Sequence, residues 1–176
     1  MMHLSNFIKC YSNILSDDLC DKIITQDVLD FQPARVGDNE LSDERKCFSK
    51  QLDDKFDKDI FNVIGQIIIQ YKKEFRHFHT GANTEDTGYE HLLYKGSDTG
   101  EYKEHTDHCD LFPRVLSCSL ILNDNYKGGD FSFFKGKHLV KKKKGSAVVF
   151  PSNFCFPHAI TPVTKGDRHS IITWIH

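Results

Sequence analysis

Residues 114–122 read RVLSCSLIL, and this run indicates the fold of the second half of the chain. It is apolar, lacks proline and glycine, and is followed by the turn residues Asn123-Asp124-Asn125, which predicts a β-strand. Turn signals such as Gly128-Gly129 and Lys165-Gly166-Asp167 separate further expected strands at Tyr89–Tyr94, Asp130–Phe134, His138–Lys141, Ser146–Phe150 and Arg168–Ile175. Many short strands without helical crossovers predict an antiparallel sandwich or a closed jelly roll.

Helices are expected in the first half of the chain. Ser16 followed by Asp17 and Asp18 offers a helix cap and an acidic first turn. A second helix is predicted at about Leu52–Phe75, where apolar residues recur at helical spacing: Phe56, Ile60, Val63, Ile64, Ile67 and Tyr71. Both helices are expected to pack on the sheet as scaffold.

The length of 176 residues predicts one domain, residues 1–176, with a helical support region at 1–80 and a jelly-roll core at 89–176. Fourteen Phe and six Tyr can fill this core. The formal charge of −2 gives no sign of nucleic-acid binding, and no apolar run has membrane-spanning length. We see no secretory signal and expect a cytoplasmic protein whose six cysteines are reduced thiols, although a disulfide framework stays open on count alone.

Three polar or glycine-bearing stretches are predicted to be loops over the mouth of the sandwich: Gln32–Glu40, Gly81–Gly88 and Lys95–Glu101. We expect at least one of them to close over a bound substrate, while each alone could be an ordinary connector. The run Lys141–Lys144 is interpreted as a solvated turn in preference to a nucleic-acid contact.

One constellation of residues suggests chemistry. His105 and Asp107 stand two apart, so on a strand they would share a face, and His158 follows a predicted apolar strand. Two imidazoles and one carboxylate on one side of an ion form the ligand set of non-haem iron(II) oxygenases. Arg168 and Ser170 would share a face of the last strand, where a buried guanidinium suits a carboxylate.

Each of these residues also has a structural interpretation. Asp107 could cap a turn, Arg168 could form a structural ion pair, and Ser170 could satisfy its own hydroxyl. Tyr94 is balanced between core packing and ligand contact, and Trp174 is favoured as a core residue. His108 and His138 are expected to be surface or packing residues.

The motifs taken together resemble the prolyl 4-hydroxylase branch of the Fe(II)- and 2-oxoglutarate-dependent oxygenases, including the PKHD-type hydroxylases. The resemblance spans roughly Tyr89 to His176 and is carried by these stretches: Tyr102–Asp107, Leu116–Asn123, Gly128–Phe131, Val149–Ser152, His158–Val163, Gly166–Arg168 and Thr173–Ile175. It implies a double-stranded β-helix, a jelly-roll and cupin-like fold that is mainly β with N-terminal helices. It further implies Fe(II), 2-oxoglutarate and O₂, with ascorbate as a candidate reductant.

The resemblance also assigns roles. His105, Asp107 and His158 match the iron ligands, Arg168 matches the residue that pairs with the distal carboxylate of 2-oxoglutarate, and Tyr94 resembles a tyrosine that hydrogen-bonds the same cosubstrate. Two departures are visible. Lys103-Glu104 replaces Pro-Lys before the first histidine, and the interval from Tyr94 to His105 is longer than expected. They bear on Tyr94 and on the choice of substrate, and Lys165 is an alternative to Arg168.

Peptidyl proline is the substrate that the resemblance implies first. Another amino-acid side chain, a small molecule or a nucleobase stays open, and a non-catalytic metal-binding sensor is a further alternative. An intact Arg168 beside an intact triad argues against the sensor, because a module without turnover has no need to bind that carboxylate. The substrate, the binding partners and the oligomeric state are not determined by the sequence.

Overall fold

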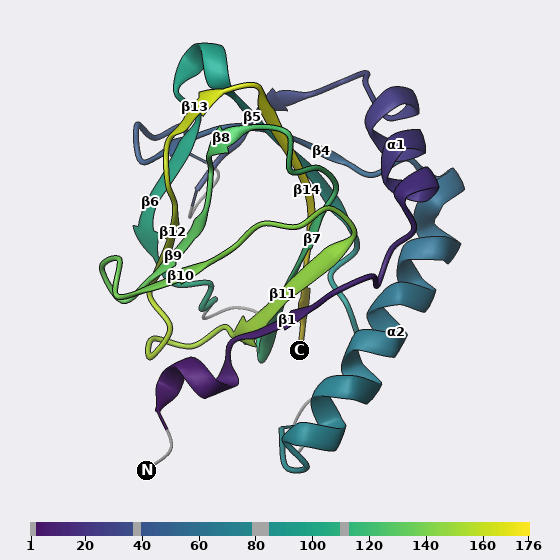
Figure 1. The fold of residues 1–176 in the computed structure, drawn as a ribbon, viewed down its shortest axis with the longest axis vertical. Coiled ribbons are helices and arrows are strands. Elements are labelled where there is room, and N and C mark those ends of the chain that lie inside the picture. The colour runs from purple at the N-terminus through teal and green to yellow at the C-terminus, as the bar shows by residue number, and fades with distance from the viewer. Residues whose placement is uncertain (1–2, 37–39, 79–84, 110–112) are drawn as a thin grey trace.

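The computed structural model describes residues 3–36, 40–78, 85–109 and 113–176, and two facing antiparallel sheets form its centre (Figure 1). The larger sheet has the order β1-β11-β7-β14-β5-β4-β2, with bounds Lys9–Tyr11, Ser146–Pro151, Leu116–Ile121, Asp167–Ile175, Glu90–Lys95, Phe48–Gln51 and Gln32–Pro33. The smaller sheet has the order β10-β9-β12-β6-β3, with bounds His138–Val140, Phe131–Phe133, His158–Ile160, Glu101–His105 and Arg45–Lys46. A short pair, β13 (Val163–Lys165) with β8 (Lys127–Gly128), completes the predicted jelly roll.

Strand β14 lies at the centre of the larger sheet and separates two apolar layers. It pairs with β7 on one side and with β5 on the other. Because successive side chains alternate between the faces of a strand, Ile171 and Ile175 belong to the layer under the helices. Arg168 and Ile172 instead point into the space between the two sheets, where they line a cavity. One strand therefore joins the scaffold to the interior of the sandwich.

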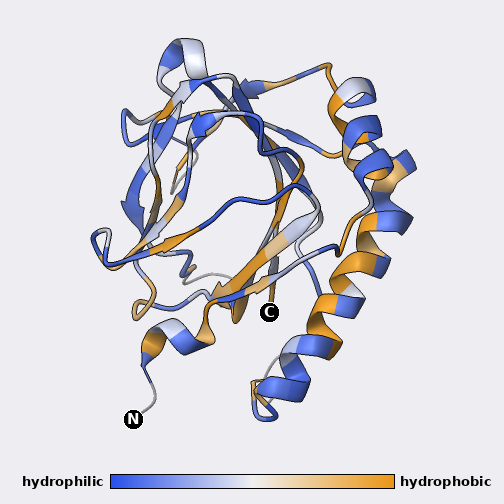
Figure 2. Ribbon diagram, viewed as in Figure 1, coloured by the Kyte–Doolittle hydropathy of each residue, from blue (hydrophilic) through white to orange (hydrophobic). Residues whose placement is uncertain are grey.

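The helices cover the outer face of the larger sheet (Figure 1). Helix α1 spans Asp17–Gln26, and the predicted cap is present because the Ser16 hydroxyl accepts a hydrogen bond from the Leu19 amide at 3.2 Å. Helix α2 spans Asp57–Glu74 after a short 3₁₀ turn, η2, at Asp54–Phe56. Apolar and polar bands alternate along α2 (Figure 2), and the apolar side is buried against the sheet. In the described residues, no helix is long and apolar enough to cross a membrane.

All six predicted strands form within two residues of their expected bounds. The strands that the sequence did not reveal are β1, β2, β3, β4, β6, β8, β12 and β13, and each has only two to five residues. Most of these carry too few apolar residues for a period-two pattern, so their pairing depends on neighbouring strands and not on local propensity. Four of them lie in residues 1–80, which therefore supply strands as well as helices.

The three predicted mouth loops differ in their structure. The stretch Gln32–Glu40 is not entirely a loop, since its first two residues form β2, while 37–39 lie outside the described residues. The first half of Gly81–Gly88, residues 81–84, also lies outside them. The stretch Lys95–Glu101 contains a 3₁₀ turn, η3 (Gly96–Asp98), packed against the turn at Gly166, where a Cβ on Gly96 would lie 2.3 Å from a backbone oxygen. This close packing counts against the use of Lys95–Glu101 as a lid.

The lysine run 141–144 makes contacts within the chain. Lys142 donates a hydrogen bond to the Gly128 carbonyl at 2.6 Å, and Lys143 donates one to Asn13. Lys144 forms an ion pair with Asp21 on α1 at 2.5 Å. Three of the four ammonium groups thus contact neighbouring elements, so the predicted solvated turn is only partly exposed.

Gly128, the last residue of β8, gives a stability prediction. Gly128 has φ +73°, and a Cβ there would lie 1.9 Å from the Pro162 carbonyl oxygen. We expect Gly128→Ala to lower the free energy of unfolding by more than about 2 kcal/mol, through strain and overlap. Gly65 in α2 is the matched control, because a Cβ there meets nothing within 4 Å, and Gly65→Ala should raise stability by up to about 1 kcal/mol. Urea unfolding of the two variants checks this, and equal effects would contradict it.

Candidate metal and cosubstrate site

A cavity of about 320 Å³ lies between the two sheets. Its walls come from both of them, with Tyr94 and Arg168 on the larger sheet and His105 and His158 on the smaller one. Aromatic rings surround the imidazole of His158, because Phe150 lies 4.6 Å away and Phe133 lies 5.5 Å away between ring centroids. The side of the cavity beside His158 is therefore aromatic, while charged and polar groups from both sheets line the rest of it.

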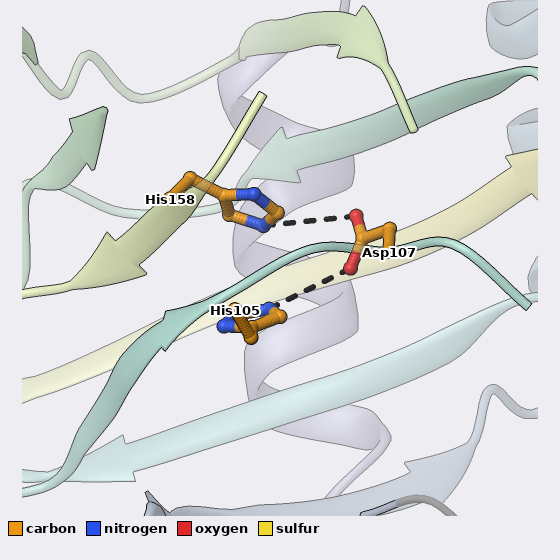
Figure 3. A group of neighbouring side chains, drawn as sticks. All are labelled: His105, Asp107 and His158. Atoms are coloured by element: carbon orange, nitrogen blue, oxygen red, sulfur yellow. Dashed lines mark ion pairs between the residues drawn. The ribbon is translucent and has the colours of Figure 1, made fainter. Parts of the chain in front are cut away.

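The three candidate metal ligands converge at this cavity (Figure 3). One ligand atom from each of His105, Asp107 and His158 lies within 4.8 Å of the other two. The Nε2 atom of His105 is 3.5 Å from one Asp107 carboxylate oxygen, and that of His158 is 3.6 Å from the other. Strand pairing causes this convergence, since His105 at the end of β6 is in register with His158 at the start of β12.

Asp107 is positioned differently from the prediction. His105 is the last residue of β6, so Asp107 lies beyond the strand and does not share a strand face with the histidine. The carboxylate is held instead by the larger sheet, where the Ser117 hydroxyl on β7 donates a hydrogen bond to it at 2.6 Å. Ser152 in turn lies 2.8 Å from Ser117, oxygen to oxygen. Ser117 escaped the sequence analysis because a serine within a strand carries no local sign of such a contact.

The two imidazoles present the same nitrogen to the centre of the site. The Nδ1–H group of His105 donates to the Lys103 carbonyl at 2.8 Å, and that of His158 donates to the Phe156 carbonyl at 3.1 Å. Each bond fixes the tautomer in which Nε2 carries a free lone pair directed at Asp107. Burial lowers the pKa of His158, which keeps that imidazole neutral and able to bind a metal.

The charge state of Asp107 suits a cation. Burial alone would raise the pKa of this carboxyl, but its pKa lies well below the usual range, and the Ser117 hydroxyl stabilises the carboxylate by donating a hydrogen bond to it. A carboxylate with two neutral imidazoles on one side is the donor set of a facial iron(II) site. The described residues therefore fit the metal that the resemblance implies.

Arg168 lies deep in the same cavity. It is 1% exposed, and its guanidinium lies 4.9 Å from the Tyr94 ring, in the register pair between β14 and β5. Its Nη1 donates a hydrogen bond to the Ser170 hydroxyl at 2.7 Å, whereas its Nε has no hydrogen-bond partner in the described residues. No carboxylate among these residues forms an ion pair with it. Because a buried guanidinium needs an anion, this site fits the distal carboxylate of a 2-oxo acid.

The remaining candidates occupy distinct places. Tyr94 lines the cavity. Ser170 is not among the lining residues, and its hydroxyl orients Arg168 by accepting a hydrogen bond from it. Trp174, expected in the core, is half-buried in the cavity wall beneath the Arg114 guanidinium, 3.7 Å from the ring centroid. His108 is exposed at the cavity edge, and His138 packs 6.2 Å from the Phe133 ring. Lys165 is exposed at the end of β13, which disfavours it as the carboxylate ligand.

Further residues of the cavity wall carry no sign of this role in the sequence. Tyr102 stacks on His105 with 3.5 Å between ring centroids, and the Arg45 guanidinium lies 5.1 Å from the centroid of the Tyr102 ring. Arg45 comes from β3 in the first half of the chain, which was expected to be helical support. Its position depends on the pairing of β3 with β6.

Comparisons with known proteins agree with this geometry. The family described as the 2OG-Fe(II) oxygenase superfamily matches residues 89–176, which is half of the chain. A PKHD-type hydroxylase of Psychrobacter sp. (strain PRwf-1) is 36% identical over 75 residues, covering 40% of this chain and 28% of the relative. The matched segment thus spans little more than a quarter of that curated relative.

Solved structures show the same fold over nearly the whole chain. A Pseudomonas putida prolyl-4-hydroxylase superposes with a TM-score of 0.72 at 20% identity, covering 97% of this chain and 92% of that one. A viral collagen prolyl hydroxylase from Paramecium Bursaria Chlorella virus-1 gives a TM-score of 0.71 at 20% identity, covering 96% and 95%. At this identity the likeness establishes the double-stranded β-helix fold.

The contact between Ser117 and Asp107 gives a prediction about metal binding. Ser117→Ala should weaken Mn(II) affinity about 10- to 100-fold, because a carboxylate ligand that loses its supporting hydrogen bond is less well oriented. Ser146→Ala is the matched control, since it removes another fully buried hydroxyl, bonded to the Lys143 carbonyl and not to the site. Titration of Mn(II) followed by electron paramagnetic resonance measures both. Equal affinities in the two variants would contradict a role for Ser117 in the metal site.

Proposed function

Because this chain belongs to the 2OG-Fe(II) oxygenase superfamily, we propose that it is an iron(II)- and 2-oxoglutarate-dependent dioxygenase that hydroxylates a C–H bond. His105, Asp107 and His158 would hold the metal, and Arg168 with Tyr94 would hold 2-oxoglutarate. When bound, iron and 2-oxoglutarate supply the oxidising chemistry, in which the 2-oxo acid is decarboxylated to succinate and one oxygen atom enters the substrate.

A single observation carries this proposal: a buried guanidinium that has no carboxylate partner among the described residues lies in the same cavity as the candidate ligand triad. A structural metal site has no use for such a group, whereas a chelating 2-oxo acid bound to the metal needs its far carboxylate neutralised. The same observation disfavours a sensor that binds only a metal. Strand pairing fixes the position of Arg168 in the larger sheet, because Arg168 is in register with Tyr94 on β5 and Ser170 with Ile121 on β7.

The chain's own residues orient the reactants and exclude water. The backbone carbonyls of Lys103 and Phe156 hold the imidazoles, and Ser117 holds the carboxylate. The rings of Phe131, Phe133 and Phe150 form a dry wall beside His158. A dry cavity strengthens the attraction between Arg168 and an incoming carboxylate, because the local dielectric constant is low.

Peptidyl proline is the substrate that we propose first. The support is the similarity to PKHD-type hydroxylases and the shared fold with prolyl hydroxylases. Incubation with Fe(II), 2-oxoglutarate, ascorbate and proline-containing peptides should release succinate and add one oxygen atom to proline, as measured by mass spectrometry. Succinate release without peptide oxidation would support the oxygenase activity but exclude peptidyl proline as the substrate.

Arg168 and Lys165 allow a direct test of cosubstrate binding. Arg168→Ala should weaken 2-oxoglutarate binding by about 2–5 kcal/mol, the range for removing one partner of a buried charge pair, and should leave Mn(II) affinity nearly unchanged. Lys165→Ala is the matched loss of an exposed cation three residues away and should bind 2-oxoglutarate normally. Calorimetric titration with 2-oxoglutarate measures both variants. A larger loss in Lys165→Ala would assign the carboxylate to Lys165.

A further inference from the structure

The arginines of this chain are gathered in one place. The sequence contains five arginines and eighteen lysines, and the cavity is lined by four of the arginines, Arg35, Arg45, Arg114 and Arg168, and by none of the lysines. The whole chain has a formal charge of −2, so this local excess of positive charge is not a consequence of composition. Guanidinium groups are suited to planar oxyanions, which they bind through two parallel hydrogen bonds.

One of the four is accounted for by the proposed function. Arg168 lies at the inner end of the cavity and would bind the cosubstrate, which leaves Arg35, Arg45 and Arg114 around the remaining space. Two carboxylates also line the cavity. Asp107 belongs to the metal site, and Glu90 is 40% exposed and lies 3.9 Å from Arg45. The wall therefore keeps a net positive charge after the metal and the cosubstrate have taken their ligands.

The groups without partners in this wall are hydrogen-bond donors. In the described residues, Nε of Arg45 and Nε of Arg114 are buried and have no hydrogen-bond partner, and the same holds for Nε1 of Trp174. Arg114 lies over the Trp174 ring at 3.7 Å, and Arg45 lies over the Tyr102 ring at 5.1 Å. The guanidinium groups of Arg45 and Arg114 thus each lie over an aromatic ring, and each has an Nε–H group that no described residue satisfies. A matching ligand presents acceptors and negative charge.

Resting on the proposed oxygenase function, we propose that the substrate carries a carboxylate close to the carbon that is hydroxylated, and that Arg45 and Arg114 bind it. We favour a carboxylate over the phosphates of a nucleic acid because a nucleic acid needs a row of basic residues that follows its backbone beyond the cavity. The one lysine run has three of its ammonium groups bound within the chain.

Trp174 provides a binding assay that does not depend on turnover. It is the single tryptophan of the chain and lies in the cavity wall, so its fluorescence reports occupancy of this space. The protein, loaded with Mn(II) and the non-reactive analogue N-oxalylglycine, is titrated with acetylated pentapeptide amides that differ only in the residues flanking a central proline. The flanks are Glu, Gln or Lys. N-acetylproline tests a small free carboxylate, and a thymidine pentanucleotide tests phosphate.

We expect the Glu-flanked peptide to bind about tenfold or more tightly than the Lys-flanked one at low ionic strength. This preference should decrease in about 0.5 M salt, because the Debye length is then only about 4 Å and the charges are screened. If N-acetylproline binds as tightly as the Glu peptide, the carboxylate that the arginines bind belongs to a small molecule and not to a flanking side chain. Equal or tighter binding of the Lys peptide overturns the proposal, and so does tighter binding of the oligonucleotide. This assay measures binding and needs no hydroxylation, so its result can be interpreted even if the protein does not oxidise proline.

Variants identify the residues responsible. Arg45→Gln and Arg114→Gln should each reduce the preference for Glu over Lys flanks several-fold, and Arg45→Lys should reduce it less than Arg45→Gln, because the charge is kept while the planar fork is lost. Lys46→Gln is the matched control, since Lys46 is the neighbour of Arg45 on β3, is exposed and does not line the cavity. Thermal melting of each variant confirms folding. An unchanged preference in both folded Arg→Gln variants overturns the assignment.

Discussion

The antiparallel register that places His158 opposite His105 is the constraint on which the rest of the site depends. These residues are 53 positions apart in the sequence, and strands β12 and β6 bring their imidazoles to a ring-centroid distance of 4.3 Å. A shift of one residue in this pairing would turn one imidazole to the opposite face of the sheet. The aromatic layer of Phe133 and Phe150 stabilises the register, because it packs on His158 from the interior.

The two sheets divide the work of the site between them. The smaller sheet supplies both imidazoles, whereas the larger sheet supplies Arg168 and, through Ser117, the hydrogen bond that fixes Asp107. The separation of the sheets therefore sets the distance between the candidate metal ligands and the Arg168 guanidinium. The helices act from outside, because α1 and α2 bury the outer face of the larger sheet and leave its inner face to the cavity. Asp27, just after α1, is buried and connects this helix to the larger sheet, because its carboxylate contacts Lys50 on β4 and His91 on β5.

Much of the fold could be predicted because its longer strands carry clear apolar patterns between turn residues. Strands such as β7 and β11 are buried along their length, and their sequences show it. The edge strands β2 and β3 could not be predicted, since two exposed or half-buried residues leave no pattern. The candidate metal ligands and Arg168, which the structure brings to one cavity, could be selected from the sequence because residue type, order and spacing together are specific. Ser117, Arg45 and Arg114 were not, since their relevance arises from strand pairing across long sequence separations. Asp107 was identified for a geometric reason that the structure corrects, because it follows β6 and does not lie within it.

The central claim is that one cavity binds iron(II) and a 2-oxo acid as a chelate. Anaerobic absorption spectroscopy tests this most directly, because a 2-oxo acid that chelates iron(II) through its keto and carboxylate oxygens gives a visible charge-transfer band. The account predicts that the band appears when wild-type protein, Fe(II) and 2-oxoglutarate are combined, that it saturates at one equivalent of each, and that it is absent when His105 is replaced by alanine. A band of undiminished intensity in His105→Ala, or binding of 2-oxoglutarate to the wild type without any band, would contradict the account.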